Sequence, residues 1–141
     1  MAFHAYLFFS GTCREAFTRY QEVFGGELFL MPMSEVPDGT EMPPGSADMI
    51  IHAALTLPDG AMLMASDDPT GDHGPVKGIS VSYTSKDAGE TKRIFDALAE
   101  GGEVTQEPTE TFFSPMFGMC VDKFGVPWMV NTEAPEQAAG G

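Results

Sequence analysis

His52 lies in the segment MIIHAALTL and is the histidine best placed to do chemistry. Imidazole titrates near neutral pH, so this side chain could hydrogen-bond a ligand or act as an acid or base. Side chains alternate along a strand, which places His52 with Ile50 and Ala54 on one face, opposite Ile51 and Ala53. If the Ile51 face meets a helix, His52 faces a cleft. The alternative is a hydrogen-bonded core or interface histidine, because the sequence identifies no carboxylate to orient it.

Methionines are frequent on or beside the strand-like segments, many of them at every second position. The chain has 10 methionines in 141 residues, and thioethers adapt to varied apolar guests. A cleft lined in this way suits a small apolar or aromatic molecule, and ordinary core filling is the alternative explanation of the same pattern. Trp128 and Met129 alternate, so only one of them can face the cleft. The candidate ligand-binding residues are His52, Met64, Phe112, Phe113, Cys120, Trp128 and Met129, with the two phenylalanines in a loop that would cover the cleft's mouth.

The two cysteines, Cys13 and Cys120, are expected to be reduced and structural, because no Cys-His dyad is recognisable. Cys13 falls in the first turn of a predicted helix, a position that lowers a thiol pKa, so it is the more reactive candidate.

A further cluster of donor side chains falls in the segment 67–75, which reads as a linker. Its members do not have the spacing of a calcium loop, so a solvated acidic linker is favoured over a cation site; they are Asp67, Asp68, Asp72 and His73.

The elements that would position these residues occur twice. The sequence Gly-Gly-Glu ends a helix-like pattern and begins a strand-like one at residues 25–27 and again at 101–103. Each half reads β-α-β-β-β, with an apolar helix stripe at spacings of three and four. In the first helix, Thr12 and Glu15 are expected to form a capping box. In the second, the expected apolar face is formed by Thr91, Ile94, Phe95 and Leu98.

The predicted fold class is α+β, built from two β-α-β-β-β modules. The chain is expected to be a single domain over 1–132. It would comprise module one at about 1–66, a linker at 67–75, module two at about 76–132 and a flexible tail at 133–141.

The net charge of −14, from 21 acidic and 7 basic residues, repels phosphate backbones and anionic lipid surfaces. Nucleic acid and membrane are therefore not expected as partners. The N-terminal segment lacks a signal-peptide pattern, and no apolar run is long enough to span a bilayer, so the protein is expected in the cytoplasm.

Two β-α-β-β-β modules resemble the vicinal oxygen chelate superfamily, which includes glyoxalase I, extradiol dioxygenases and bleomycin-resistance proteins. The stretches AYLFFSGTCREAFTRYQEVFGGEL, IIHAALTLPDGAMLMASDD and FGMCVDKFGVPWMVN look closer still to its PhnB-like branch, also labelled 3-demethylubiquinone-type. The resemblance covers roughly residues 3–132, with DKFGVPWMVN as its most specific element. It implies a homodimer, and a fold in which the two modules form a cupped mixed sheet around a cleft with the helices outside.

Metal-using members of the superfamily take His or Glu ligands from the first and last strands of each module. Transferred to this chain, those positions fall on Ala5 (with His4 one residue away), Met64, Gly78 or Ser80, and Met129. None of these suits Zn, Ni, Fe or Mn, so we expect neither the usual metal site nor another cofactor. The branch's methyltransferase label is also disfavoured, because the glycine pairs follow helices and no G-x-G-x-x-G occurs.

The sequence thus favours metal-independent binding of a small apolar or aromatic molecule in the cleft between paired modules. One alternative is a lyase or isomerase with a displaced metal site that involves His52. Another is a dimeric interaction protein without a ligand site. No catalytic residue is assigned, and whether the protein is an enzyme is left open.

Overall fold

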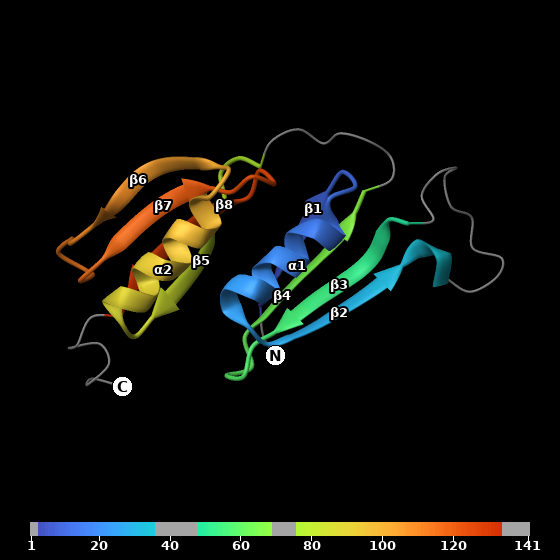
Figure 1. Ribbon diagram of the computed structural model, residues 1–141, viewed down its shortest axis with the longest axis horizontal. Coiled ribbons are helices and arrows are strands. Elements are labelled where there is room, and N and C mark those ends of the chain that lie inside the picture. Colours follow the sequence, from blue (N-terminus) through green and yellow to red (C-terminus); the bar gives the residue numbers. More distant parts are fainter. Residues whose placement is uncertain (1–2, 36–47, 69–75, 134–141) are drawn as a thin grey trace. The chain divides into compact units, whose positions relative to one another are not determined.

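The computed structural model describes residues 3–35, 48–68 and 76–133, which belong to two compact units divided after residue 74. Both units run strand, helix and three further strands (Figure 1). The elements of the first are β1 (Ala5–Phe9), α1 (Cys13–Phe24), β2 (Glu27–Pro32), the 3-10 turn η1 (Met33–Glu35), β3 (Ile50–Thr56) and β4 (Met62–Asp67). Those of the second are β5 (Val81–Ser85), α2 (Ala88–Ala99), β6 (Glu103–Thr109), β7 (Phe117–Val121) and β8 (Pro127–Thr132).

The two sheets have the same topology. The strand order is β1-β4-β3-β2 in one unit and β5-β8-β7-β6 in the other. In each sheet the first strand pairs in parallel with the last, and the remaining pairs are antiparallel. The predicted α+β class and the duplicated β-α-β-β-β module are therefore confirmed.

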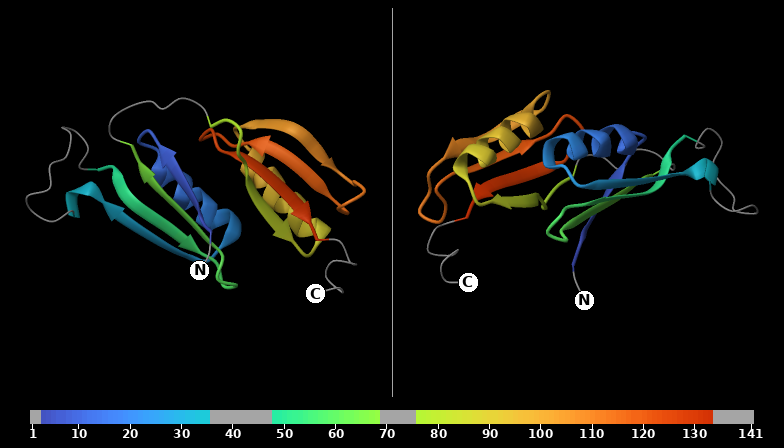
Figure 2. Two further views of the ribbon diagram at one scale, coloured as in Figure 1. Left: turned by 180° about the vertical axis from the view of Figure 1, so that it is seen from behind. Right: turned by 60° about the horizontal axis from the view of Figure 1, so that its bottom comes forward.

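In the first unit, α1 covers one face of the sheet (Figure 2). The sequence predicts an apolar stripe of Ala16, Phe17, Tyr20, Val23 and Phe24, and the structure buries the first four of these and leaves Phe24 partly exposed. The stripe packs over sheet residues that are themselves buried, and the Phe9 and Phe17 rings meet edge to face with centroids 6.3 Å apart. Burial of these apolar side chains is the main favourable term for this unit.

In the second unit, α2 contacts β7 and β8 in the corresponding way. Its predicted apolar face is confirmed, since Thr91, Ile94, Phe95 and Leu98 are all buried. Thr91 is the polar residue of this face, and its burial is compensated by a hydrogen bond, because its hydroxyl lies 2.6 Å from that of Thr132 on β8.

The repeated Gly-Gly-Glu has a steric explanation. The second glycine of each pair passes against the end of the third strand of its unit. A Cβ atom added at Gly26 would lie 2.4 Å from the carbonyl oxygen of Thr56, and one at Gly102 would lie 2.1 Å from that of Val121. Any side chain at these two positions would push the helix end off the sheet, so both modules require glycine there.

The start of α1 differs from the prediction. Thr12 occupies the N-cap position but makes no side-chain capping bond, so the expected capping box is wrong. Instead, Oδ1 of Asp67, at the end of β4, accepts the backbone N–H groups of Gly11 and Cys13, each at 2.9 Å. A carboxylate brought by the sheet thus satisfies the helix N-terminus, where negative charge is stabilising.

Candidate functional site

The candidate site lies on the face of the first sheet opposite α1, which we call the helix-free face. Strand register identifies its residues. Tyr6 on β1 pairs with Met64 on β4, Met64 with Ala54 on β3, and Ala54 with Phe29 on β2. These four side chains form one row across the whole sheet, because directly paired residues point to the same side.

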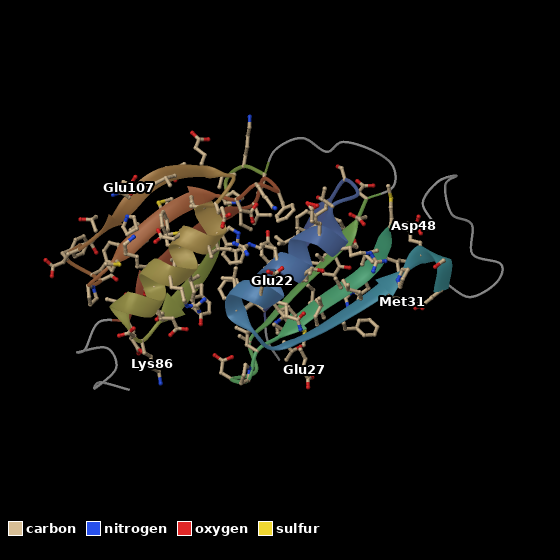
Figure 3. All side chains as sticks on the ribbon, in the orientation of Figure 1. Glu22, Glu27, Met31, Asp48, Lys86 and Glu107 are labelled. Carbon is tan, nitrogen blue, oxygen red and sulfur yellow. The ribbon has the colours of Figure 1, made fainter. Side chains whose placement is uncertain are left out.

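The next row adds further ring and thioether groups to this face. Phe8 pairs with Ser66, and Met31 pairs with His52; Figure 3 labels Met31 on β2. Large apolar groups therefore occupy positions that a solvent-facing sheet surface would normally give to polar residues. The phenylalanines are well exposed, Phe8 at 56% and Phe29 at 54%, and Tyr6 follows at 40%.

His52 connects the aromatic rings of this face. The Tyr6 hydroxyl lies 3.2 Å from Nδ1 of His52, and the two rings stack with centroids 5.9 Å apart and planes 29° apart. Phe29 lies on the other side, with its ring centroid 6.3 Å from that of His52. Phe8 continues the series, 5.3 Å from Tyr6. The result is an unbroken aromatic surface from β1 to β2, which we call the aromatic cluster: Tyr6, Phe8, Phe29 and His52.

The contact between Tyr6 on β1 and His52 on β3 crosses β4, the strand that lies between them. On this face β4 contributes Met64 opposite Tyr6 and the small Ser66 opposite Phe8. Ala54 follows His52 on the same face of β3 and is also small. This arrangement combines a flat apolar surface, which suits stacking, with one polar pair, which can orient a ligand.

The corresponding face of the second sheet has a different chemistry. Its central row is Ser82, Met129, Met119 and Gln106, and its next row contains Thr84, Asn131, Phe117 and Thr109. By topology, Tyr6 corresponds to Ser82, Phe29 to Gln106, and His52 to Phe117. The second face therefore keeps the methionine of the central row, Met129 in place of Met64, but lacks the aromatic cluster.

The predicted loop phenylalanines lie beside this second face. Phe113 packs edge to face on Phe117, with centroids 5.1 Å apart, and Phe112 packs on Phe113 at the same separation. Phe112 is fully exposed and Phe113 is 40% exposed. Asn131, paired with Phe117, carries a buried Oδ1 for which the described residues provide no hydrogen-bond partner.

Two candidate ligand-binding residues lie on the opposite side, toward α2. Cys120 on β7 pairs with Trp128 on β8, and each residue is at most 2% exposed. The indole Nε1 of Trp128 donates to Oδ2 of Asp122 at 2.9 Å. Of the alternating pair, Met129 is therefore the one on the helix-free face, and Cys120 and Trp128 are core residues of the second unit.

A bulge changes the predicted faces of β3. Met31 pairs with His52, while the next residue, Pro32, pairs with Ile50, so Ile51 is an extra residue in β3. The alternation is broken there, and Ile50 is completely buried whereas His52 is not. The expectation that Ile50 and His52 share a face is therefore wrong, although Ala54 does share it.

Cys13 was expected to be the more reactive of two structural thiols, and that ranking is wrong. Burial, together with the nearby negative charge of Asp67, raises the pKa of Cys13 to about 12. Burial, together with Asp122, likewise raises the pKa of Cys120 to about 11. Desolvation disfavours the thiolate, and in Cys13 it outweighs the effect of the helix N-terminus.

Asp67 is not part of a solvated acidic linker. It ends β4, is 4% exposed, and uses both carboxylate oxygens: Oδ2 accepts the N–H of Ile50 at 2.9 Å, in addition to the two bonds at the start of α1. Asp68 lies just beyond the strand, and Asp72 and His73 lie outside the described residues. Of the four residues considered as a cation cluster, Asp67 is therefore committed to backbone N–H groups.

The positions transferred from metal-using proteins can now be placed. Ala5 pairs with Leu63 and lies on the α1 side, so Tyr6, not Ala5, takes the helix-free face of the first strand. Gly78 and Ser80 precede β5. Within residues 3–35, 48–68 and 76–133, no three His, Cys, Asp or Glu side chains are grouped as metal ligands would be.

Of the residues singled out in the sequence, His52 and Met64 lie on the helix-free face of the first sheet and Met129 on the corresponding face of the second, whereas Tyr6, Phe8 and Phe29 were not singled out. The signal was the alternation in AYLFF, where Ala5, Leu7 and Phe9 point one way and Tyr6 and Phe8 the other. Alternation alone does not say which set faces the helix. The buried Phe9 decides this in the structure.

Comparisons with known proteins give a consistent result. The model of the family described as 3-demethylubiquinone-9 3-methyltransferase matches residues 1–131. Protein YjdN of Escherichia coli strain K12 is 34% identical over 140 residues, covering 93% of this chain and 95% of YjdN. The crystal structure of protein PA1353 from Pseudomonas aeruginosa is 41% identical, with a TM-score of 0.86 over 94% of this chain and 98% of that one.

A structure from Bacillus cereus, described as a putative 3-demethylubiquinone-9 3-methyltransferase, PhnB protein, is 26% identical; its TM-score is 0.75 over 94% of this chain and 99% of that one. Structures described as glyoxalase/bleomycin resistance/dioxygenase proteins have TM-scores of 0.65 and 0.62 at 15% and 13% identity, and share the fold alone. Among the described helices, none is both long and apolar enough to cross a membrane.

Proposed function

The chain belongs to the 3-demethylubiquinone-9 3-methyltransferase family, the PhnB-like branch of the glyoxalase/bleomycin resistance fold, and from this premise we propose that it binds a small planar aromatic molecule without a metal ion. The binding surface in this proposal is the helix-free face of the first sheet. Its central residues are His52, Met64, Tyr6 and Phe29.

The observation that carries the proposal is the aromatic cluster. Single exposed apolar side chains are ordinary on protein surfaces, but contiguous ones mark binding sites. Here three aromatic rings and an imidazole form a continuous series, each within 6.3 Å of the next. Neighbouring strands lie about 4.8 Å apart, so a surface over four strands is about 14 Å wide, enough for a ligand of two or three fused rings.

Methyl transfer finds no support in these residues, despite the family's description. Enzymes that use S-adenosylmethionine in a strand-to-helix turn need glycines there to approach the cofactor closely. In the described part of the chain, the turns that lead from a strand into an α-helix are Ser-Gly-Thr at 10–12 and Lys-Asp at 86–87. Neither has the Gly-rich pattern.

Thermal melting with and without EDTA tests the proposal. We expect 2-ethylnaphthalene to raise the melting temperature equally in both conditions, since a ligand that binds only the native state stabilises it in proportion to ln(1 + [L]/Kd). The double variant Tyr6→Ser, Phe29→Gln gives the first sheet the residues that the second sheet has at the equivalent positions, Ser82 and Gln106. The module is therefore expected to fold with these residues. The double variant should lose the ligand-induced shift, whereas Ser82→Ala on the second sheet should retain it.

An unchanged shift in the double variant would refute the proposed surface. A shift that disappears in EDTA would refute metal independence.

A second candidate function rests on the hydrogen bond between Tyr6 and His52. A phenol–imidazole pair can move a proton, so a lyase or isomerase that uses His52 as a base or metal ligand is the enzymatic alternative. Metal analysis of untagged protein separates the two. A stoichiometric ion that is lost in His52→Ala would favour the enzyme over the binding protein.

The aromatic cluster could also be an interface with a second copy, and we include the homodimer expected for this family in the proposal. Light scattering of the wild type and the Tyr6→Ser, Phe29→Gln variant distinguishes the possibilities. A dimer that persists in the variant agrees with ligand binding at this surface. A dimer that dissociates, without any aromatic ligand binding to the wild type, would favour an interaction protein.

A further inference from the structure

We infer that Tyr6 is a positioning residue that holds His52 with its proton on Nε2, so that the preferred ligand is an aromatic molecule carrying a hydrogen-bond acceptor, such as an aryl ketone. This inference rests on the proposed function and adds the chemical class of the ligand. Its basis is the 3.2 Å separation of the Tyr6 hydroxyl from Nδ1 of His52.

The direction of this hydrogen bond follows from the chemistry of the two groups. A phenol is a good O–H donor, and the unprotonated nitrogen of a neutral imidazole is a good acceptor. When Tyr6 donates to Nδ1, that nitrogen must lack a proton, and the neutral ring then carries it on Nε2. The ring contact between the two side chains, with planes only 29° apart, keeps the imidazole from turning away.

Nε2 is the nitrogen that remains for a ligand. It lies farther from the backbone than Nδ1, and the described residues provide it with no partner. His52 is on the helix-free face, partly exposed, with Phe29 on its other side. A ring stacked on this cluster would present its oxygen substituent to an N–H donor whose proton cannot move to Nδ1 without breaking the bond from Tyr6.

The second sheet provides a matched comparison. The position equivalent to His52 is Phe117, which has a similar planar shape but no donor. His52→Phe is therefore a substitution that the module already tolerates at this place. It removes the polar recognition while keeping the aromatic surface.

The tautomer is measured directly, without any ligand. A long-range 1H–15N correlation spectrum of 15N-labelled protein distinguishes the two neutral forms, and His52→Phe assigns the signal. We expect the Nε2–H form in the wild type and a mixture of tautomers in Tyr6→Phe, which retains the ring but not the hydroxyl. The Nδ1–H form in the wild type would overturn the inference.

The ligand preference is measured with a matched pair of probes, 2-acetylnaphthalene and 2-ethylnaphthalene, which differ by one carbonyl oxygen. We compare the ratio of their dissociation constants between proteins, so that their different hydrophobicities cancel. A net hydrogen bond corresponds to about a two- to tenfold change. The preference for the ketone should fall by that factor in His52→Phe, and by less in Tyr6→Phe, whatever each substitution does to the affinity for the shared ring system.

The outcomes separate this inference from the function on which it rests. If both probes bind and the ratio is the same in His52→Phe, the inference fails and the proposed function stands. If neither probe binds the wild type, the proposed function fails together with the ligand preference, and the spectrum alone decides the role of Tyr6.

Discussion

Replacing Asp67 by asparagine should lower the free energy of unfolding by about 3–5 kcal/mol, although the two side chains have nearly the same shape. Asp67 is buried and accepts three backbone N–H groups, those of Gly11 and Cys13 on Oδ1 and that of Ile50 on Oδ2, each at 2.9 Å. An asparagine that keeps its oxygen at the Oδ1 site retains the first two bonds but turns an NH2 group toward the N–H of Ile50.

The magnitude follows from these contacts. Hydrogen bonds to charged groups contribute about 1.5–3 kcal/mol and neutral ones about 0.5–1.5, so the two retained bonds lose about 1 kcal/mol each. The N–H of Ile50 is left buried without an acceptor, which costs about 1–3 kcal/mol more. The sum is about 3–5 kcal/mol, a large part of the stability of a small domain.

Urea unfolding followed by far-UV circular dichroism measures this change. Asp87→Asn is the control, because Asp87 caps α2 with one exposed bond to the N–H of Glu90, and asparagine caps helices as well as aspartate does. We expect this variant to change stability by less than about 0.5 kcal/mol. Equal losses of unfolding free energy in the two variants would refute the conclusion that Asp67 ties the start of α1 and the start of β3 to the end of β4.

Three further results are expected. Gly26→Ala should destabilise the protein by at least about 2 kcal/mol in urea unfolding, because φ is +89° and the new Cβ would lie 2.4 Å from the Thr56 oxygen. Gly60→Ala, at φ +95° but with open space around it, should cost clearly less, and equal costs would contradict the steric argument. Cys13 and Cys120, with pKa values raised to about 12 and 11 by burial, should resist thiol reagents at pH 8 until the protein unfolds. Because the unfolded chain loses these thiol protons first, the free energy of unfolding should decline as pH rises from about 9 toward 12. Rapid labelling of the native protein would contradict the raised thiol pKa values.

The helices and the duplication could be predicted because their signals are local. The stripe of α1 and the face of α2 follow the helical period, and the Gly-Gly-Glu repeats mark the same corner in both modules. The sequence could not explain why the second glycine of each pair is required, because Gly26 approaches Thr56 only when the helix packs on its sheet.

The candidate site depended more heavily on tertiary structure. His52 could be selected as a histidine in a central strand, but its partner Tyr6 lies 46 positions away and comes from a strand that is not its neighbour. Likewise, Asp67 reads as an acidic linker residue until β4 brings it beside residues 54 and 56 positions earlier in the chain. Strand order and register create these contacts, and neither is encoded in local spacing.

The sequence alone determined the module, its repetition and its two periodicities, because the choice between helix and strand depends on side chains within a few residues of one another. Only the tertiary structure decided which face of each strand meets the helix. That choice placed Trp128 and Cys120 in the core and Tyr6, Phe29 and His52 on a shared surface. The physical reason is that a pleated strand offers two chemically different faces, and burial against a helix selects between them for the whole sheet at once.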